Sequence, residues 1–130
     1  MRATLSNYRQ APRKVRLIAD LIRGETVERA YTILEQTPKR ATDQVRKLLA
    51  SAVANAQQSG RALERELVVR EVRVDEGVTL KRFRPVSRGS AHPIRKRTST
   101  VTIVLGRTTV KNQESRIKNK KKSVRADQNS

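Results

Sequence analysis

Seven Lys and Arg side chains, and no carboxylate, lie between residues 81 and 97. A guanidinium group binds phosphate through two parallel N–H···O bonds, and an ammonium group contacts it as a point charge. Cations packed this densely cannot be buried without partners, because their desolvation is too costly. The segment therefore predicts an arm that binds RNA along its length. Its cations are Lys81, Arg82, Arg84, Arg88, Arg95, Lys96 and Arg97.

Residues suited to catalysis or metal binding are few. His92 is the single histidine, the chain has no cysteine, and the acidic pair Asp75 and Glu76 stands alone before the arm. No glycine-rich phosphate loop occurs. We therefore expect no enzyme, no cofactor, no metal site and no small-molecule substrate, and His92 is interpreted as a polar or phosphate-facing contact. No apolar run approaches the ~20 residues of a membrane span, and no signal or transit peptide opens the chain.

The net charge of +18 is unevenly distributed. Residues 1–76 carry 15 Lys and Arg against 10 Asp and Glu, whereas residues 77–130 carry 15 against 2. Aromatic residues are few (Tyr8, Tyr31 and Phe83), which argues against proteins that stack successive bases of a single strand on aromatic side chains. Recognition through phosphates, sugars and the shape of folded RNA is the expectation that remains.

Two strand-like runs position the basic segment. Residues 67–74 are apolar and β-branched, and residues 98–105 alternate, with Val101, Ile103 and Leu105 on one face. Together they predict a long β-hairpin with its tip near Gly89, where a tight turn needs positive φ. Fourteen residues at ~3.3 Å each would reach roughly 45 Å. Pro85 and Pro93 are expected to block regular ladder pairing of this exposed ribbon.

Helical periodicity precedes these strands. Pro12 suits a first helical position and Gly24 a stop, while Thr26 is a candidate cap for a second helix. Thr37 and Pro38 repeat the same signal before the longest helix, which we expect to end near Gly60. Apolar positions at helical spacing in the three helices are Val15, Ile18, Ala19 and Ile22; Val27, Ala30, Tyr31 and Leu34; and Ala41, Val45, Leu48, Leu49, Ala52, Val53 and Ala56.

These elements predict an α+β fold. Three helices should pack on one face of a small antiparallel three-stranded sheet, whose third strand is an edge strand within the first ten residues. We expect one domain over residues 1–106, including the extended hairpin arm at about 76–99. Residues 107–130 form a basic tail that should be disordered when free. The tail either stays solvated or orders against nucleic acid, and its candidate nucleic-acid contacts are Lys118, Lys120, Lys121 and Lys122.

Several segments, in order from about residue 2 to 105, resemble one family. They lie in the first helix, at both ends of the long helix, and along the arm and its return. The segments are 12–24, 37–41, 51–56, 74–77, 80–85 and 94–99. Together they are similar to the bacterial form of the universal L-twenty-two family of large-subunit ribosomal proteins.

The resemblance implies a structural constituent of the large subunit, located in the cytoplasmic ribosome of a bacterial-type system or in a bacterial-type organelle. It implies a body seated on 23S-type rRNA, beside other large-subunit proteins, and a hairpin lining the nascent-peptide exit tunnel. Arg13, Lys14 and Arg16 would face rRNA. The arm cations Lys81, Arg82, Arg84, Arg95, Lys96 and Arg97 would anchor the hairpin. Arg88, Gly89 and Ser90 at the tip would approach the tunnel wall and the nascent peptide.

The chain departs from the family pattern at four positions. Ala11 stands where the family often has a capping Ser, and Val78 replaces a usual Pro. Val86 and Ser90 stand where Arg is common, so the tip is less basic than in the family. From the residues alone, an architectural DNA-binding protein that enters a minor groove with its arm is the alternative. A regulatory role outside the ribosome is a third possibility, although no feature of the sequence specifically indicates it.

Overall fold

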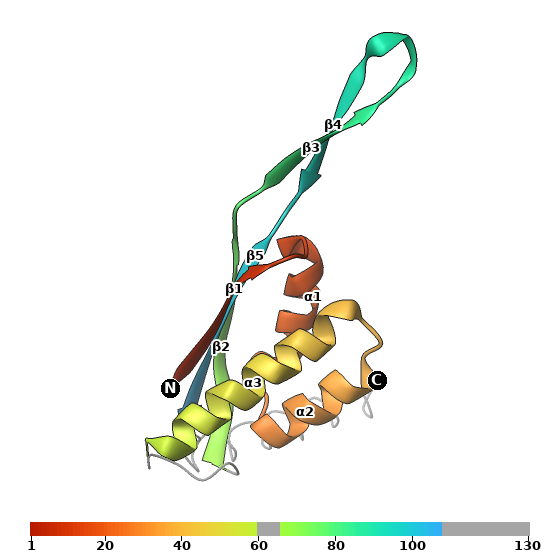
Figure 1. Cartoon of the computed structure of the whole chain (residues 1–130). Coiled ribbons are helices and arrows are strands. Elements are labelled where there is room, and N and C mark those ends of the chain that lie inside the picture. The colour runs from red at the N-terminus through yellow and green to blue at the C-terminus, as the bar shows by residue number, and fades with distance from the viewer. Residues whose placement is uncertain (60–65, 108–130) are drawn as a thin grey trace, which may run out of the picture.

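The computed structural model describes residues 1–59 and 66–107, which form three helices and five strands. In order they are β1 (Arg2–Tyr8), α1 (Pro12–Ile22), α2 (Val27–Gln36), α3 (Arg40–Gln58), β2 (Leu67–Glu76), β3 (Leu80–Pro85), β4 (Ala91–Lys96) and β5 (Ser99–Arg107). The helices lie on one side of a sheet, and a long two-stranded arm leaves its far end (Figure 1). The predicted α+β class is confirmed.

The body is built on a three-stranded antiparallel sheet in the order β1-β5-β2. The last strand in sequence is thus central, and Ile103 pairs with Ala3 on one side and Val72 on the other. Val101, Ile103 and Leu105 are buried, as their alternation predicts. The edge strand expected within the first ten residues is β1.

Helix α1 begins and ends where its sequence indicates. Pro12 occupies the first helical position, where its missing N–H costs no hydrogen bond. The helix ends at Ile22, and Gly24 then takes a φ of 79°, a conformation that disfavours other residues. Its buried face follows the predicted helical spacing: Pro12, Val15, Ile18, Ala19 and Ile22.

The boundary between α2 and α3 corrects one prediction. Thr26 caps α2 as expected, because its hydroxyl accepts from the Arg29 N–H at 3.4 Å. Thr37, however, closes α2 instead of opening α3: its hydroxyl donates to the Ile33 carbonyl at 2.7 Å. Helix α3 starts at Arg40 after Lys39, with no side-chain cap. A threonine hydroxyl can bond to a backbone N–H at the start of a helix or to a carbonyl near its end, and Thr37 makes the second kind of bond.

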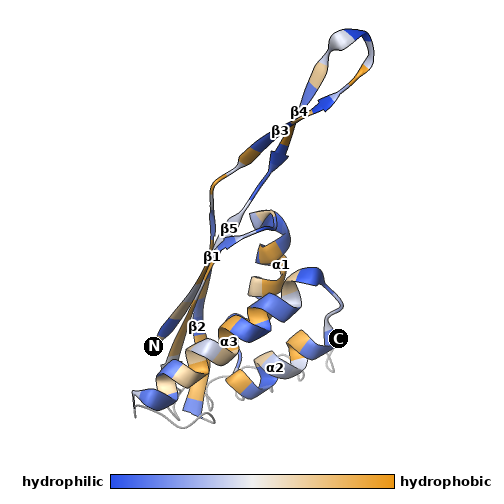
Figure 2. Cartoon of the chain, in the orientation of Figure 1, coloured by the Kyte–Doolittle hydropathy of each residue, from blue (hydrophilic) through white to orange (hydrophobic). Residues whose placement is uncertain are grey.

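The apolar stripe of α3 forms the centre of the core. All seven positions predicted from its periodicity are buried: Ala41, Val45, Leu48, Leu49, Ala52, Val53 and Ala56. Figure 2 shows hydrophobic residues of the helices and strands in orange against blue hydrophilic ones. The helix ends at Gln58, and Gly60, its expected stop, lies outside the described residues.

The arm is a separate two-stranded sheet of β3 and β4, and not an unbroken extension of β2 and β5. The chain leaves the ladder between Glu76 and Leu80 and returns to it after Thr98. The two prolines do not interrupt the arm, which corrects a second prediction: Pro93 pairs with Phe83, and Pro85 pairs with Ala91. A two-stranded ribbon has two outer edges, where a missing N–H removes no ladder bond.

The tip is a tight turn at Ser87–Gly89, in which the Ser90 N–H donates to the Ser87 carbonyl at 3.3 Å. Arg88 and Gly89 both take positive φ, at 59° and 73°. The Val86 N–H donates to the Ser90 carbonyl at 2.9 Å and closes the turn. The tip therefore lies where the sequence predicts it.

Candidate nucleic-acid interface

A groove of about 670 Å³ lies at the root of the arm, between the body and the β3–β4 ribbon. Its walls come from the turn after β1, the first turns of α1 and α3, and the root of the arm. We call this feature the root groove. It is lined by Arg9, Gln10, Ala11, Lys14, Arg40, Leu80, Arg82, Arg95, Lys96, Arg97 and Thr98. Seven of these residues are Lys or Arg, and none is acidic.

The root groove unites predicted site residues that are far apart in sequence. It brings Lys14 of the first helix together with four arm cations: Arg82, Arg95, Lys96 and Arg97. Like charges converging on one groove repel one another, and a bound polyanion relieves that repulsion. Arg13, Lys81 and Arg84 are exposed but do not line the groove.

Arg9 and Arg40 complete the groove, although the sequence interpretation missed them. Both stand beside a helix start without a side-chain cap, at Ala11 for α1 and at Lys39 for α3. Helix N-termini carry partial positive charge and open N–H groups, so basic residues are unfavourable there unless an anion binds. Basic residues at uncapped helix starts were therefore the available signal.

Tyr8 fixes this wall of the groove. Its hydroxyl donates to Gln10 Oε1 at 2.7 Å and contacts the Arg40 carbonyl at 3.4 Å, which links the end of β1 to the start of α3. Burial raises the pKa of the Tyr8 phenol above its ordinary value of 10.0, with the Arg40 charge acting in the opposite direction. The side chain thus stays protonated and able to donate at neutral pH.

The arm cations have no carboxylate partners within the part of the chain that the structure describes. Every ion pair there joins residues of the body, such as Asp20 with Arg23 at 2.7 Å. Across the ribbon, Lys81 even pairs with Arg95. Like charges placed directly opposite each other destabilise a ladder, so this pairing favours an external anion.

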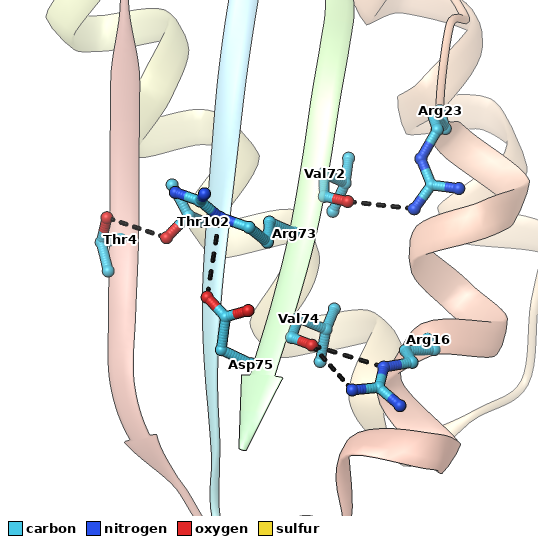
Figure 3. Close-up of polar contacts among 8 residues, drawn as sticks. All are labelled: Thr4, Arg16, Arg23, Val72, Arg73, Val74, Asp75 and Thr102. Carbon is cyan, nitrogen blue, oxygen red and sulfur yellow. Dashed lines mark hydrogen bonds and ion pairs between the residues drawn. The ribbon is translucent and has the colours of Figure 1, made fainter. Parts of the chain in front are cut away.

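Arg16 has a role that its sequence position does not indicate. Its Nε and Nη2 groups donate to the Val74 carbonyl at 3.3 and 3.2 Å, and Arg23 donates to the Val72 carbonyl at 3.0 Å (Figure 3). Both carbonyls lie on the outer edge of β2, which is an edge strand of the sheet. The two guanidinium groups therefore cover an edge that could otherwise pair with another chain.

Short hydrogen bonds join the two segments that connect the body to the arm. The Gly77 N–H donates to the Thr98 carbonyl at 3.0 Å, and the Thr98 hydroxyl donates to the Val78 carbonyl at 2.7 Å. Thr98 is only 7% exposed. These contacts hold residues 77–78 against Thr98 between the end of the β2–β5 ladder and the start of the β3–β4 ladder.

The remaining predicted site residues lie at the tip and in the tail. Arg88, Gly89 and Ser90 are exposed at the end of the arm, and His92 is exposed on β4. The predicted tail contacts Lys118, Lys120, Lys121 and Lys122 lie outside the described residues. Among residues 1–59 and 66–107, no helix is long and apolar enough to cross a membrane, and no cluster of acidic, His or Cys side chains could hold a metal.

Comparison with known proteins identifies the family. The family model for ribosomal protein L22p/L17e matches residues 3–106. The large ribosomal subunit protein uL22 of Pediococcus pentosaceus is 52% identical over 103 residues, which cover 79% of this chain and 87% of that protein. The protein of the same name from Christiangramia forsetii is 51% identical, with 80% and 79% covered. That of Lactobacillus delbrueckii subsp. bulgaricus is 53% identical, with 80% and 89% covered. This chain therefore belongs to the ribosomal protein L22p/L17e family.

Proposed function

We propose that this protein binds large-subunit, 23S-type rRNA through the root groove and the arm, and that its tip reaches the nascent-peptide exit tunnel. The observation that carries the proposal is the root groove, where seven cations meet without a carboxylate. As a member of its family the chain is a structural component of the large ribosomal subunit and no enzyme. Its location is accordingly the cytoplasmic ribosome.

Phosphate binding supplies the affinity. Arg82, Arg95 and Arg97 each offer a guanidinium fork that fits a phosphate, and Lys14 and Lys96 add point charges. Helix α3 begins at Arg40 in the same groove without a side-chain cap, and the partial positive charge of its N-terminus favours a bound phosphate there. Neutralising about 8 phosphates gives a log–log dependence of affinity on salt with a slope near −6 to −7.

The length of the arm supports the tunnel assignment. From Gly77 to Gly89 the chain spans 12 residue steps, or roughly 40 Å if fully extended. An arm of this reach adds nothing to the apolar core, since no arm residue belongs to it. It fits a role inside folded RNA, where Arg88, Gly89 and Ser90 would contact the tunnel wall and the nascent peptide. The body would meanwhile contact neighbouring large-subunit proteins and support assembly.

Arg13, Lys81 and Arg84 would add phosphate contacts outside the groove, from exposed positions on α1 and β3. Arg16 would contribute less than these three, because its guanidinium already donates to Val74. The tail would add contacts through Lys118, Lys120, Lys121 and Lys122.

Sedimentation of tagged full-length protein from lysate, washed at high salt, tests the proposal. We expect the protein in the large-subunit fractions, and we expect a deletion of residues 82–96 to lose it while keeping a folded body. Lys47→Ala removes an exposed α3 cation outside the root groove and is the matched control, which should sediment as wild type. Full-length protein that sediments with DNA, or stays unbound, would overturn the proposal and favour the architectural alternative.

A further inference from the structure

Phe83 is the only phenylalanine of the chain, and it lies on the arm instead of in the core. It is 72% exposed, the largest exposure among the big apolar side chains that the structure describes. Burying such a ring would stabilise a fold by about 1.5–3 kcal/mol in ordinary bookkeeping. The ring is not buried within the described chain, so a binding partner could bury it and gain this stabilisation.

The register of the ribbon shows what surrounds the ring. Pro93 stands directly opposite Phe83, and two residues nearer the tip Pro85 pairs with Ala91. Side chains alternate between the two faces of a strand, so these four share one face. The middle of this face is thus apolar, on a ribbon that is otherwise rich in cations.

Charged residues border this face at its root end. Lys81 and Arg95 form the next pair on the same side, two residues or roughly 6.6 Å from Phe83 and Pro93. The opposite face is mixed, and its pairs are Leu80 with Lys96, Arg82 with Ile94, and Arg84 with His92. An aromatic ring next to a pair of cations has the composition of a site for a nucleotide, with an apolar part for the base and charges for its phosphates.

We propose that Phe83, backed by Pro93, stacks on an unpaired RNA base that is turned out of its helix, while Lys81 and Arg95 bind the adjoining phosphates. This inference rests on the proposed binding of rRNA and names a contact within it. Every base has a π-face, so the stack is tolerant of sequence. The scarcity of aromatic residues fits this single stack, since one ring can hold one base but not a run of them.

Charge complementarity selects RNA over a protein surface as the partner. No acidic residue occurs between residues 77 and 113, whereas Lys and Arg recur throughout. Interfaces between proteins are depleted of charged residues at their centres. An apolar ring beside cations that have no carboxylate partner in the described chain matches a nucleic acid better.

Affinity measurements on the full-length chain test the stack. The probes are an RNA stem–loop with a loop of unpaired adenines, a fully paired RNA duplex of equal length, and inorganic polyphosphate, which has the charge but no bases. Phe83→Leu should weaken stem–loop binding by roughly 5- to 150-fold, the range that removal of one stacked base gives. Its binding to duplex and polyphosphate should not change, nor should the salt slope. Phe83→Tyr should restore the affinity.

Fluorescence gives an independent measurement, because the chain contains no tryptophan. Phe83→Trp should keep stem–loop affinity, and its emission should be quenched by stem–loop RNA but not by polyphosphate. Val78→Trp is the matched control, since Val78 is 67% exposed and lies near the arm root outside the ladder. It should show little quenching. Equal quenching of both variants would mean mere proximity to RNA and would overturn the stack.

The outcomes separate this inference from the function on which it rests. If the wild-type protein bound neither RNA probe, the proposed function itself would be contradicted. Wild-type binding with an unaffected Phe83→Leu variant would sink only the stack. A third outcome is that Phe83→Leu binds the RNA probes as wild type does, but is lost from large subunits reconstituted with the other ribosomal proteins. The ring would then contact a protein, and the inference would be wrong. Unchanged melting of Phe83→Leu verifies that the variant is folded.

Discussion

Replacing Gly77 with alanine should destabilise the protein through one close contact. A Cβ atom at this position would lie 2.5 Å from the Thr98 hydroxyl oxygen, a separation that real Cβ atoms essentially never show. The requirement is one of space and not of backbone conformation, because Gly24 and Gly89 are the glycines with positive φ in the described chain. The Thr98 side chain would have to rotate away.

The expected cost follows from the hydrogen bond that this rotation breaks. Thr98 is 7% exposed and donates to the Val78 carbonyl at 2.7 Å, so its hydroxyl would lose this partner where water has little access. Such a loss costs about 1–3 kcal/mol. Alanine also restricts the unfolded chain, which offsets about 0.4–1 kcal/mol. The midpoints of these two ranges leave a net destabilisation of about 1.3 kcal/mol, which should lower Tm by roughly 5–10 °C.

Urea denaturation of a double-mutant cycle tests the cause as well as the size of the effect. Thr98→Ala removes the obstructing oxygen, so adding Gly77→Ala to it should cost little more than Thr98→Ala alone. Gly89→Ala is the control: a Cβ there meets nothing within 4 Å, and its cost should come only from a φ of 73° and be independent of Thr98. A stable Gly77→Ala variant, or strictly additive costs for Gly77 and Thr98, would refute the reasoning.

Three further predictions concern binding and stability at single side chains. Lys14→Ala should weaken rRNA binding, measured by filter binding, without changing the free energy of unfolding. Arg16→Ala should lose about 0.5–1.5 kcal/mol of stability in urea melts, and should self-associate through the uncovered edge of β2, which light scattering would detect. The reverse pattern would contradict both assignments. The folded pKa of Tyr8 is raised, so its contribution to stability is present below about pH 10 and is lost as pH rises through that folded value. Wild type should therefore lose more stability than Tyr8→Phe as the pH rises above about 10, and parallel losses would exclude this coupling. The Ser99 hydroxyl is buried without a hydrogen-bond partner, so Ser99→Ala should be neutral or stabilising by up to about 1 kcal/mol in urea melts; a large destabilisation would mean that the hydroxyl has an unseen partner.

The sequence alone determined the elements whose signals are local. The stripe from Ala41 to Ala56 predicts α3 because burial repeats at the period of a helix. The alternation of Val101, Ile103 and Leu105 predicts the inner face of β5 for the same reason at the period of a strand. The density of arm cations indicates a polyanion as partner, since charge needs no fold to be recognised.

Tertiary structure decided which residues act together. Arg9, Arg40 and Lys96 meet in one groove only because β1, α3 and β4 converge there, and no sequence spacing encodes that distance. Packing of α1 on β2 likewise turns Arg16 toward the Val74 carbonyl, and the meeting of the two segments at the arm root sets Gly77 against Thr98. Periodicity reports which face of an element is buried, whereas the partner of a single side chain depends on packing between elements far apart in the chain.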